Sequence, residues 1–138
     1  MPNWNEATIN EFHAKAGKGV GPFGDQLILL TTKGARSGKE RISPVMYHRD
    51  GERYIVVASK GGAPDNPDWY NNLKSNPVAR VEVGTATGTE TFEVRAREAE
   101  GEERERMFAD RVAIAPGFGE YERMTSRKIP VMILERIG

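Results

Sequence analysis

The apolar positions of this chain fall mainly into short runs and alternating stretches, which is typical of strands. Leu27 to Leu30 form an unbroken apolar run, and its length predicts a buried strand over residues 26–32. Residues 42–47 and 54–58 predict a second and a third strand. Asp50-Gly51 between them signals a hairpin, because glycine tolerates the positive φ that such turns require.

Two later segments alternate between apolar and polar residues. Residues 79–83 and 92–97 each place every second residue on one face, so one face is buried and the other is solvated. Residues 131–137 predict a last strand. About six strands joined mostly by hairpins favour a mostly β fold with appended helices, because few crossover connections are available for a parallel sheet.

Helical signals stand between these strands. Asn3 is expected to cap an N-terminal helix, which ends at Gly17 and leads into a glycine-rich segment. Asn66-Pro67 predicts the start of a short helix, with Asn66 as its cap, and Asn76-Pro77 ends it. Residues 100–115 predict a further helix. Its inward face is expected to hold Met107, Phe108 and Val112, and its solvated face the acidic residues with Arg104 and Arg106.

Length and composition restrict the function classes. The 138 residues fit one domain over residues 1–138, with residues 1–25 as the N-terminal helix and lead-in. Lys and Arg (20) balance Asp and Glu (20), so any anion site must be local, and a nucleic-acid reader is disfavoured. The absence of cysteine excludes disulfides and thiolate chemistry. The two histidines lack partners at ligand spacing, so no metal site is expected.

No apolar stretch approaches the roughly 18 residues that a membrane-spanning helix needs. The N-terminus is interrupted by polar residues and does not read as a signal peptide. We therefore expect a cytoplasmic protein without an integral membrane segment.

The strongest candidate for chemistry is the basic loop between the first two strands, Lys33-Gly34-Ala35-Arg36-Ser37-Gly38-Lys39-Glu40-Arg41. It carries four cations against one anion in a chain of zero net charge. Its glycines allow a tight turn that could present backbone N–H groups to a phosphate, and arginine and lysine add charge. An ordinary solvated hairpin turn is the alternative.

A second candidate follows the third strand, where Ser59-Lys60-Gly61-Gly62 places a hydroxyl, an ammonium and flexible backbone at a sheet rim. Trp69 and Tyr70 come soon afterwards and could wall a planar ring system. The alternatives are an ordinary loop and a tryptophan that simply belongs to the core. Two basic, glycine-bearing loops at neighbouring strand ends favour an anion site formed by both.

Several segments together resemble the deazaflavin-dependent nitroreductase family, whose members use coenzyme F420. The resemblance covers most of residues 27–134 and rests on these motifs: Leu29-Leu30-Thr31-Thr32-Lys33-Gly34, Arg36-Ser37-Gly38, Arg41, Ser43-Pro44-Val45-Met46-Tyr47, Ser59-Lys60-Gly61-Gly62-Ala63, Asn66-Pro67-Asp68-Trp69-Tyr70-Asn71-Asn72-Leu73-Lys74 and Ile129-Pro130-Val131.

That resemblance implies a split β-barrel, similar to the FMN-binding split barrels, of about six antiparallel strands. It also implies that the basic loop and Lys60 hold the phosphate and the polyglutamate tail, and that the strand after the loop and the Trp69-Tyr70 helix line the deazaflavin. The implied cofactor-binding residues are Ala35, Arg36, Ser37, Gly38, Arg41, Ile42, Ser43, Pro44, Val45, Met46, Ala58, Ser59, Lys60, Gly61, Trp69 and Tyr70.

The implied reaction is hydride transfer from the reduced deazaflavin to an electron-poor acceptor such as a quinone, an enone or a nitroaromatic. Ser59 or Tyr121 is the expected catalytic hydroxyl, and Phe118 and Tyr121 are expected to contact substrate. Phe118 stands where nitroreducing members carry a tyrosine. It cannot donate a proton, which argues against nitroimidazole reduction.

The sequence is also compatible with other functions. The same barrel could use FMN, or it could carry the cofactor or a lipid-like ligand without catalysis. A homodimer and association with a membrane through a quinone substrate are also compatible with the sequence, which does not name the acceptor.

Overall fold

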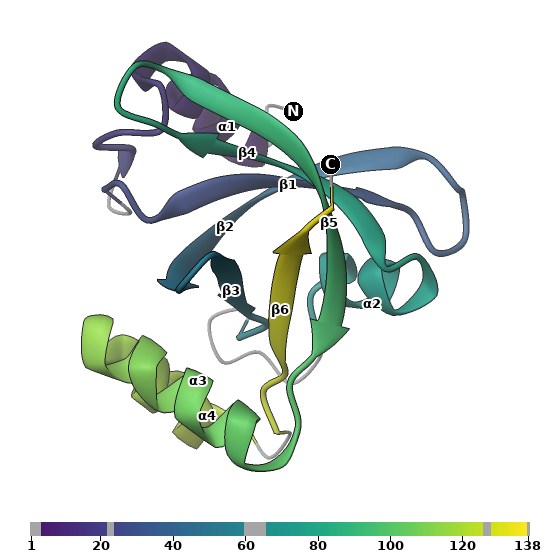
Figure 1. Ribbon diagram of the computed structural model, residues 1–138, viewed down its shortest axis with the longest axis vertical. Coiled ribbons are helices and arrows are strands. Elements are labelled where there is room, and N and C mark those ends of the chain that lie inside the picture. The colour runs from purple at the N-terminus through teal and green to yellow at the C-terminus, as the bar shows by residue number, and fades with distance from the viewer. Residues whose placement is uncertain (1–3, 22–23, 60–65, 126–127, 138) are drawn as a thin grey trace.

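The computed structural model describes residues 4–21, 24–59, 66–125 and 128–137, with the side chains of residues 4 and 5 left out. Figure 1 shows the elements in chain order. These are α1 (Trp4–Lys15), β1 (Leu27–Lys33), β2 (Glu40–Asp50), β3 (Arg53–Val57), α2 (Asp68–Ser75), β4 (Val78–Gly84), β5 (Thr89–Glu98), α3 (Gly101–Ile114), α4 (Gly117–Met124) and β6 (Val131–Arg136).

The six strands close into a barrel in the order β1-β2-β3-β6-β5-β4, and every neighbouring pair is antiparallel. The β2–β3 hairpin turns at Gly51, whose φ of +62° suits glycine. The prediction of a mostly β fold with about six antiparallel strands and appended helices is therefore confirmed.

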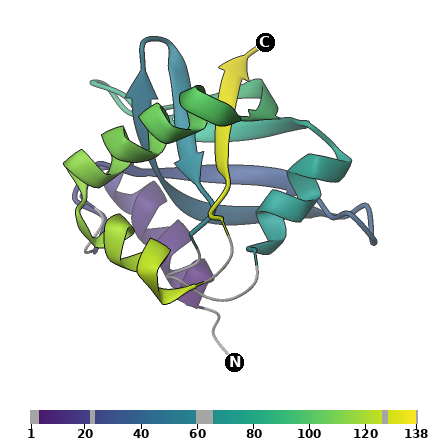
Figure 2. The same cartoon turned by 90° about the horizontal axis from the view of Figure 1, so that it is seen from below.

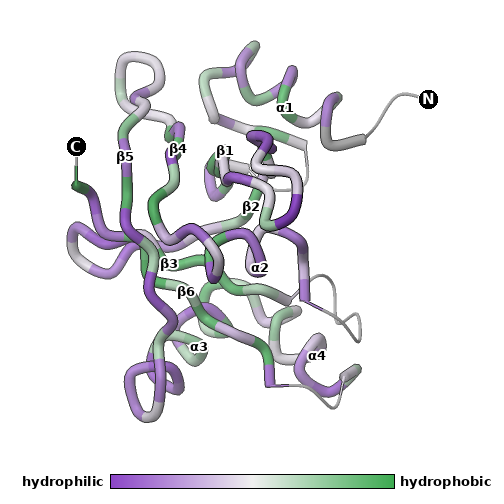
Figure 3. Tube along the Cα trace, turned by 90° about the vertical axis from the view of Figure 1, so that its right-hand side faces the viewer, coloured by the Kyte–Doolittle hydropathy of each residue, from purple (hydrophilic) through white to green (hydrophobic). Residues whose placement is uncertain are grey.

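The barrel is filled from alternate positions of its strands, and this alternation is visible in the hydropathy of the chain (Figure 3). Ile28 and Leu30 from β1 pack with Val81 from β4 and Val94 from β5 in one interior cluster. Helix α2 joins the same cluster through Trp69 and Leu73, among others. This helix therefore packs into the barrel core, and it lies apart from the other three helices (Figure 2).

The outer face of the barrel is covered in two places. Phe12 of α1 packs against Leu27 and Leu29 of β1. Helices α3 and α4 cover the outer faces of β3 and β6, which are consequently buried on both sides (Figure 1). Met46 of β2 packs against both of these outer clusters, so it lies at their junction.

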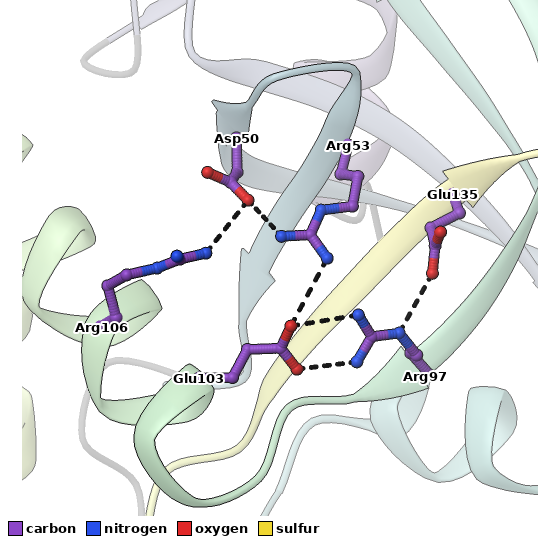
Figure 4. A network of polar contacts seen from close by, with 6 residues as sticks. All are labelled: Asp50, Arg53, Arg97, Glu103, Arg106 and Glu135. Atoms are coloured by element: carbon purple, nitrogen blue, oxygen red, sulfur yellow. Dashed lines mark hydrogen bonds and ion pairs between the residues drawn. The ribbon is translucent and has the colours of Figure 1, made fainter.

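Helix α3 is also tied to the barrel by ion pairs. The network joins the β2–β3 hairpin, β5, β6 and α3, and consists of Asp50, Arg53, Arg97, Glu103, Arg106 and Glu135 (Figure 4). Glu103 is its centre, with Oε1 and Oε2 2.7 and 3.1 Å from the terminal nitrogens of Arg97. Such a network fixes the start of α3 against the barrel.

Two details differ from the sequence predictions. Pro67, not Asn66, occupies the N-cap position of α2, and no side chain caps that helix. Arg104 is buried on the inward face of α3, whereas it was expected on the solvated face. The expected cap at Asn3 lies outside the described residues. None of the described helices is both long and apolar enough to span a membrane.

Candidate cofactor and acceptor site

The basic loop, residues 33–41, closes on itself between β1 and β2. Gly34 N–H donates to the Lys39 carbonyl at 2.7 Å, and Gly38 N–H donates to the Gly34 carbonyl at 2.9 Å. Gly38 has a φ of +71°, and a Cβ at Gly34 would lie 2.7 Å from the Ser37 hydroxyl oxygen. The positive φ of Gly38 therefore favours glycine, whereas a side chain at position 34 would require the Ser37 hydroxyl to turn away.

The backbone of this loop is mostly committed to internal contacts. Besides the two glycine N–H groups, Lys39 N–H donates to the Ser37 hydroxyl at 3.2 Å, and Ala35 N–H donates to the Asn72 side chain at 3.0 Å. The N–H groups of Gly34, Ala35, Gly38 and Lys39 already have acceptors within the protein. Any anion bound here depends mainly on the cationic side chains.

Those side chains are exposed and available. Lys33, Arg36, Lys39 and Arg41 are all exposed, and no carboxylate of the described residues lies within ion-pair distance of any of them. The loop's own acid, Glu40, instead pairs with Arg80 on β4 at 3.3 Å. Four exposed cations in one short loop, without a carboxylate partner in the described part of the chain, form a local positive site in a chain of zero net charge.

Asn72 connects this loop to helix α2. Its side chain is buried, accepts the Ala35 N–H and donates to the Thr32 hydroxyl at 3.1 Å. The sequence did carry a signal for this contact. Asn72 lies three residues after inward Trp69, so a polar group falls on the buried face of the helix and needs a partner there.

The β2 residues that follow the loop change from exposed to buried. Ile42 is exposed, Ser43 and Pro44 are half-buried, and Val45 enters the barrel core. Met46 is half-buried on the outer face. Met46 packs against both the α1 cluster and the α3–α4 cluster.

The end of β3 lies deeper. Ala58 is fully buried and its N–H donates to the Pro130 carbonyl at 2.9 Å, and Ser59 is buried beside it. Lys60 and Gly61, the remaining expected cofactor residues of this turn, lie outside the described residues.

The aromatic pair on α2 is divided between two roles. Trp69 is only 8% exposed and belongs to the barrel core. This agrees with the alternative interpretation of Trp69 as a core residue. Tyr70 donates its hydroxyl to Glu98 at 2.7 Å, and burial together with that carboxylate raises the pKa of Tyr70 to about 12. Tyr70 is therefore held as a neutral phenol against β5.

The expected substrate residues lie together on α4. The rings of Phe118 and Tyr121 meet edge to face with centroids 5.3 Å apart. Phe118 is buried in the α3–α4 cluster, and Tyr121 and Met46 pack against that same cluster. The structure thus brings Met46 of β2 and the α4 aromatics to one apolar cluster, whereas the basic loop contacts α2 through Asn72.

A groove of about 310 Å³ lies at the foot of the basic loop. Its walls come from the end of β1, the first residue of β2, the α2–β4 connection with the start of β4, and the middle of β5. The lining residues are Thr31, Thr32, Lys33, Glu40, Asn76, Pro77, Val78, Ala79, Arg80 and Glu93. Cations and carboxylates alternate around it, so the groove itself is not selective for anions.

Comparison with known proteins gives a consistent result. The family model described as F420H(2)-dependent quinone reductase matches residues 4–136. An F420H(2)-dependent quinone reductase of Mycobacterium tuberculosis is 37% identical over 112 residues, which span 79% of this chain and 72% of that protein.

Solved structures agree with this relationship. A structure of an F420-H2 dependent reductase (FDR-A) is 43% identical with a TM-score of 0.71, and the match covers 80% of this chain and 94% of that one. A structure described as a domain-swapped dimer is 40% identical with a TM-score of 0.74, covering 94% and 95%. A heme storage protein of Vibrio cholerae, at 16% identity and a TM-score of 0.62 over 97% and 91%, shares the fold alone.

Proposed function

The chain belongs to the F420H(2)-dependent quinone reductase family, and we propose that it transfers hydride from reduced coenzyme F420 to a quinone. The observation that carries this proposal is the set of four exposed cations, Lys33, Arg36, Lys39 and Arg41, which have no carboxylate partner among the described residues. A phosphate-bearing, acidic cofactor is the kind of ligand that such a loop fits.

The residues of the chain fit the cofactor in two parts. Arg36 and Arg41 would pair with its phosphate and acidic tail, together with Lys60. The strip from Ile42 to Met46 would lie against the ring system, because its outer side chains are apolar and half-exposed. The bound cofactor supplies the hydride chemistry, and the protein supplies position and a dry site.

The acceptor would lie against α4. Phe118 offers an apolar edge without a proton to donate, and the Tyr121 hydroxyl, on a half-buried side chain, can donate one. Ser59 is the second candidate hydroxyl, and it is buried at the end of β3. An apolar surface with a single phenol would suit a flat quinone better than a nitroimidazole, for which Phe118 lacks a donor.

The experiment that tests this proposal is a fluorescence titration of coenzyme F420 with the purified protein. We expect binding at micromolar concentration or tighter, and Arg36→Ala should weaken it about tenfold through the loss of one charge-assisted contact. Arg49→Ala is the matched control, because Arg49 is an exposed cation at the opposite end of β2. Absence of binding would refute the proposal, and a yellow protein carrying a flavin spectrum would replace it with an FMN enzyme.

We also propose that the protein forms a homodimer and acts in the cytoplasm on a small-molecule acceptor. The support for the dimer is the 40% identical structure described as a domain-swapped dimer, which the chain matches over 94% of its length. Sedimentation of the purified protein at several concentrations tests it.

A further inference from the structure

Arg111 of α3 is fully buried between the barrel and the α4 aromatics. Its terminal nitrogens donate to the Tyr47 carbonyl at 3.0 Å and to the Gln26 side-chain oxygen at 2.6 Å. Its guanidinium carbon lies 5.0 Å from the centroid of the Phe118 ring. The side chain therefore joins strand β2, one residue beyond Met46, to the helix that carries the expected substrate residues.

Arg104 on the same helix provides an internal comparison. It lies seven residues earlier on the same inward face, is also buried, lies 4.5 Å from the Phe108 ring centroid and donates to a backbone carbonyl, that of Ile129. Arg104 has two carboxylate partners, Glu105 at 3.1 Å and Glu122 at 3.7 Å. Within the described part of the chain, Arg111 has none, and its acceptors are both neutral.

The surroundings of Arg111 do not neutralise its charge. His48, which follows Tyr47, is buried, and neither of its ring nitrogens has a hydrogen-bond partner among the described residues. Burial and the nearby Arg111 charge lower the pKa of His48, while Asp110 and Asp50 act in the opposite direction. Histidine carries no negative charge in either protonation state, so His48 supplies no counter-charge to the Arg111 guanidinium, which lies 5.0 Å from the Phe118 ring centroid. An unpaired buried charge lowers the stability of the fold, so a function that uses the charge would account for its presence.

We propose that Arg111 is a positioning residue of the acceptor side, whose unneutralised charge behind Phe118 favours acceptors that gain negative charge on reduction. The inference rests on the proposed function. When a quinone takes a hydride, one hydrogen and two electrons leave the reduced deazaflavin, which becomes oxidised. The quinone gains that hydrogen and one negative charge, and a proton then completes the hydroquinone. A fixed positive charge in a water-poor region stabilises the anion formed in the first step.

Two substitutions of Arg111 distinguish the effect of its charge from the effect of its side-chain shape. Arg111→Met keeps an unbranched side chain in the core but removes the charge, and such replacements of buried charges are often tolerated by the fold. Arg111→Lys keeps the charge but loses the planar fork. Arg104→Met is the matched control, because it removes a buried arginine of the same helix that has carboxylate partners.

The first readout needs no cofactor. The chain has only two histidines, so their pKa values can be followed separately by NMR. We expect Arg111→Met to raise the pKa of His48 and Arg111→Lys to leave it near the wild-type value. His13 is exposed and lies 2.9 Å from Glu82. A His13→Gln variant identifies which NMR signal belongs to His48. An unchanged His48 pKa in Arg111→Met would show that the charge is screened, and the inference would be wrong.

The second readout compares kcat/KM for a soluble quinone with the Kd of coenzyme F420. We expect Arg111→Met to lower kcat/KM roughly tenfold, with Arg111→Lys within about threefold and Arg104→Met close to wild type. The Kd of coenzyme F420 should be the same in all of them. Equal losses in Arg111→Met and Arg111→Lys would assign the effect to shape and overturn the inference. Failure of the wild-type protein to bind the cofactor would instead overturn the proposed function, while the histidine titration would still report on Arg111.

Discussion

Replacing Asn72 with alanine tests whether helix α2 holds the basic loop ready for its ligand. The substitution removes the acceptor of the Ala35 N–H at 3.0 Å and the donor to the Thr32 hydroxyl at 3.1 Å. It leaves every cation of the loop in place. A change in cofactor affinity would therefore come from the shape of the loop and not from its charge.

The size of the effect follows from these two contacts. Each neutral hydrogen bond contributes about 1 kcal/mol, so Asn72→Ala should lower the free energy of unfolding by about 2 kcal/mol. For a domain of this size the corresponding loss in Tm is roughly 6–8 °C. Binding must then order the freed backbone at Ala35, which costs about 1 kcal/mol per residue and weakens the Kd of the cofactor roughly fivefold.

The assay combines thermal unfolding with fluorescence titration of coenzyme F420 at two salt concentrations. Asn71→Ala is the matched control, because Asn71 is the exposed neighbour on the same helix and alanine favours a helix there. We expect Asn71→Ala to leave both quantities unchanged. In Asn72→Ala the affinity should fall by the same factor at both salt concentrations, because the loop charges are intact.

Preorganisation of the loop by Asn72 is refuted if Asn72→Ala loses stability but binds the cofactor as tightly as wild type. It also fails if Asn71→Ala behaves like Asn72→Ala, since the effect would belong to the whole helix.

Two further results are expected. Contacts from Arg53 and Arg97 lower the pKa values of Asp50 and Glu103 below their ordinary 3.8 and 4.5. The stabilising contribution of these two carboxylates is complete above their ordinary pKa values and is lost as the pH falls through the lowered pKa values. The Tm of the wild type should therefore drop in acid, and the Tm of Glu103→Gln should drop less steeply. Parallel plots of Tm against pH for the two proteins would contradict this. Tyr121→Phe should reduce kcat for a quinone about 100-fold without changing the Kd of the cofactor. Unchanged turnover would exclude Tyr121 as the proton donor.

The strands of this fold were predictable because the hydrophobic pattern of each strand reflects which of its faces are buried. Leu27 to Leu30 read as a buried strand, and the alternation around Val81 and Val94 read as strands with one solvated face. The closure of the barrel did not follow from such local patterns, because the pairings β1–β4 and β3–β6 join segments far apart in the chain.

The site was predictable in its residue types but not in its contacts. The charge of the basic loop could be read directly, whereas the internal bonding of Gly34 and Gly38 could not, because it depends on how the turn closes. Arg111 could not be separated from the other arginines of α3 by sequence. That it has no carboxylate partner among the described residues appears only once β2 and α4 have packed around it.

The most direct test of the central claim is anaerobic mixing of the protein, reduced coenzyme F420 and a soluble quinone, followed by the return of the oxidised cofactor's visible absorbance. We predict fast oxidation that requires both the protein and the quinone and that is weakened by Arg36→Ala. A protein that binds the reduced cofactor tightly but never speeds its oxidation by any quinone would be a carrier, and the account would be contradicted.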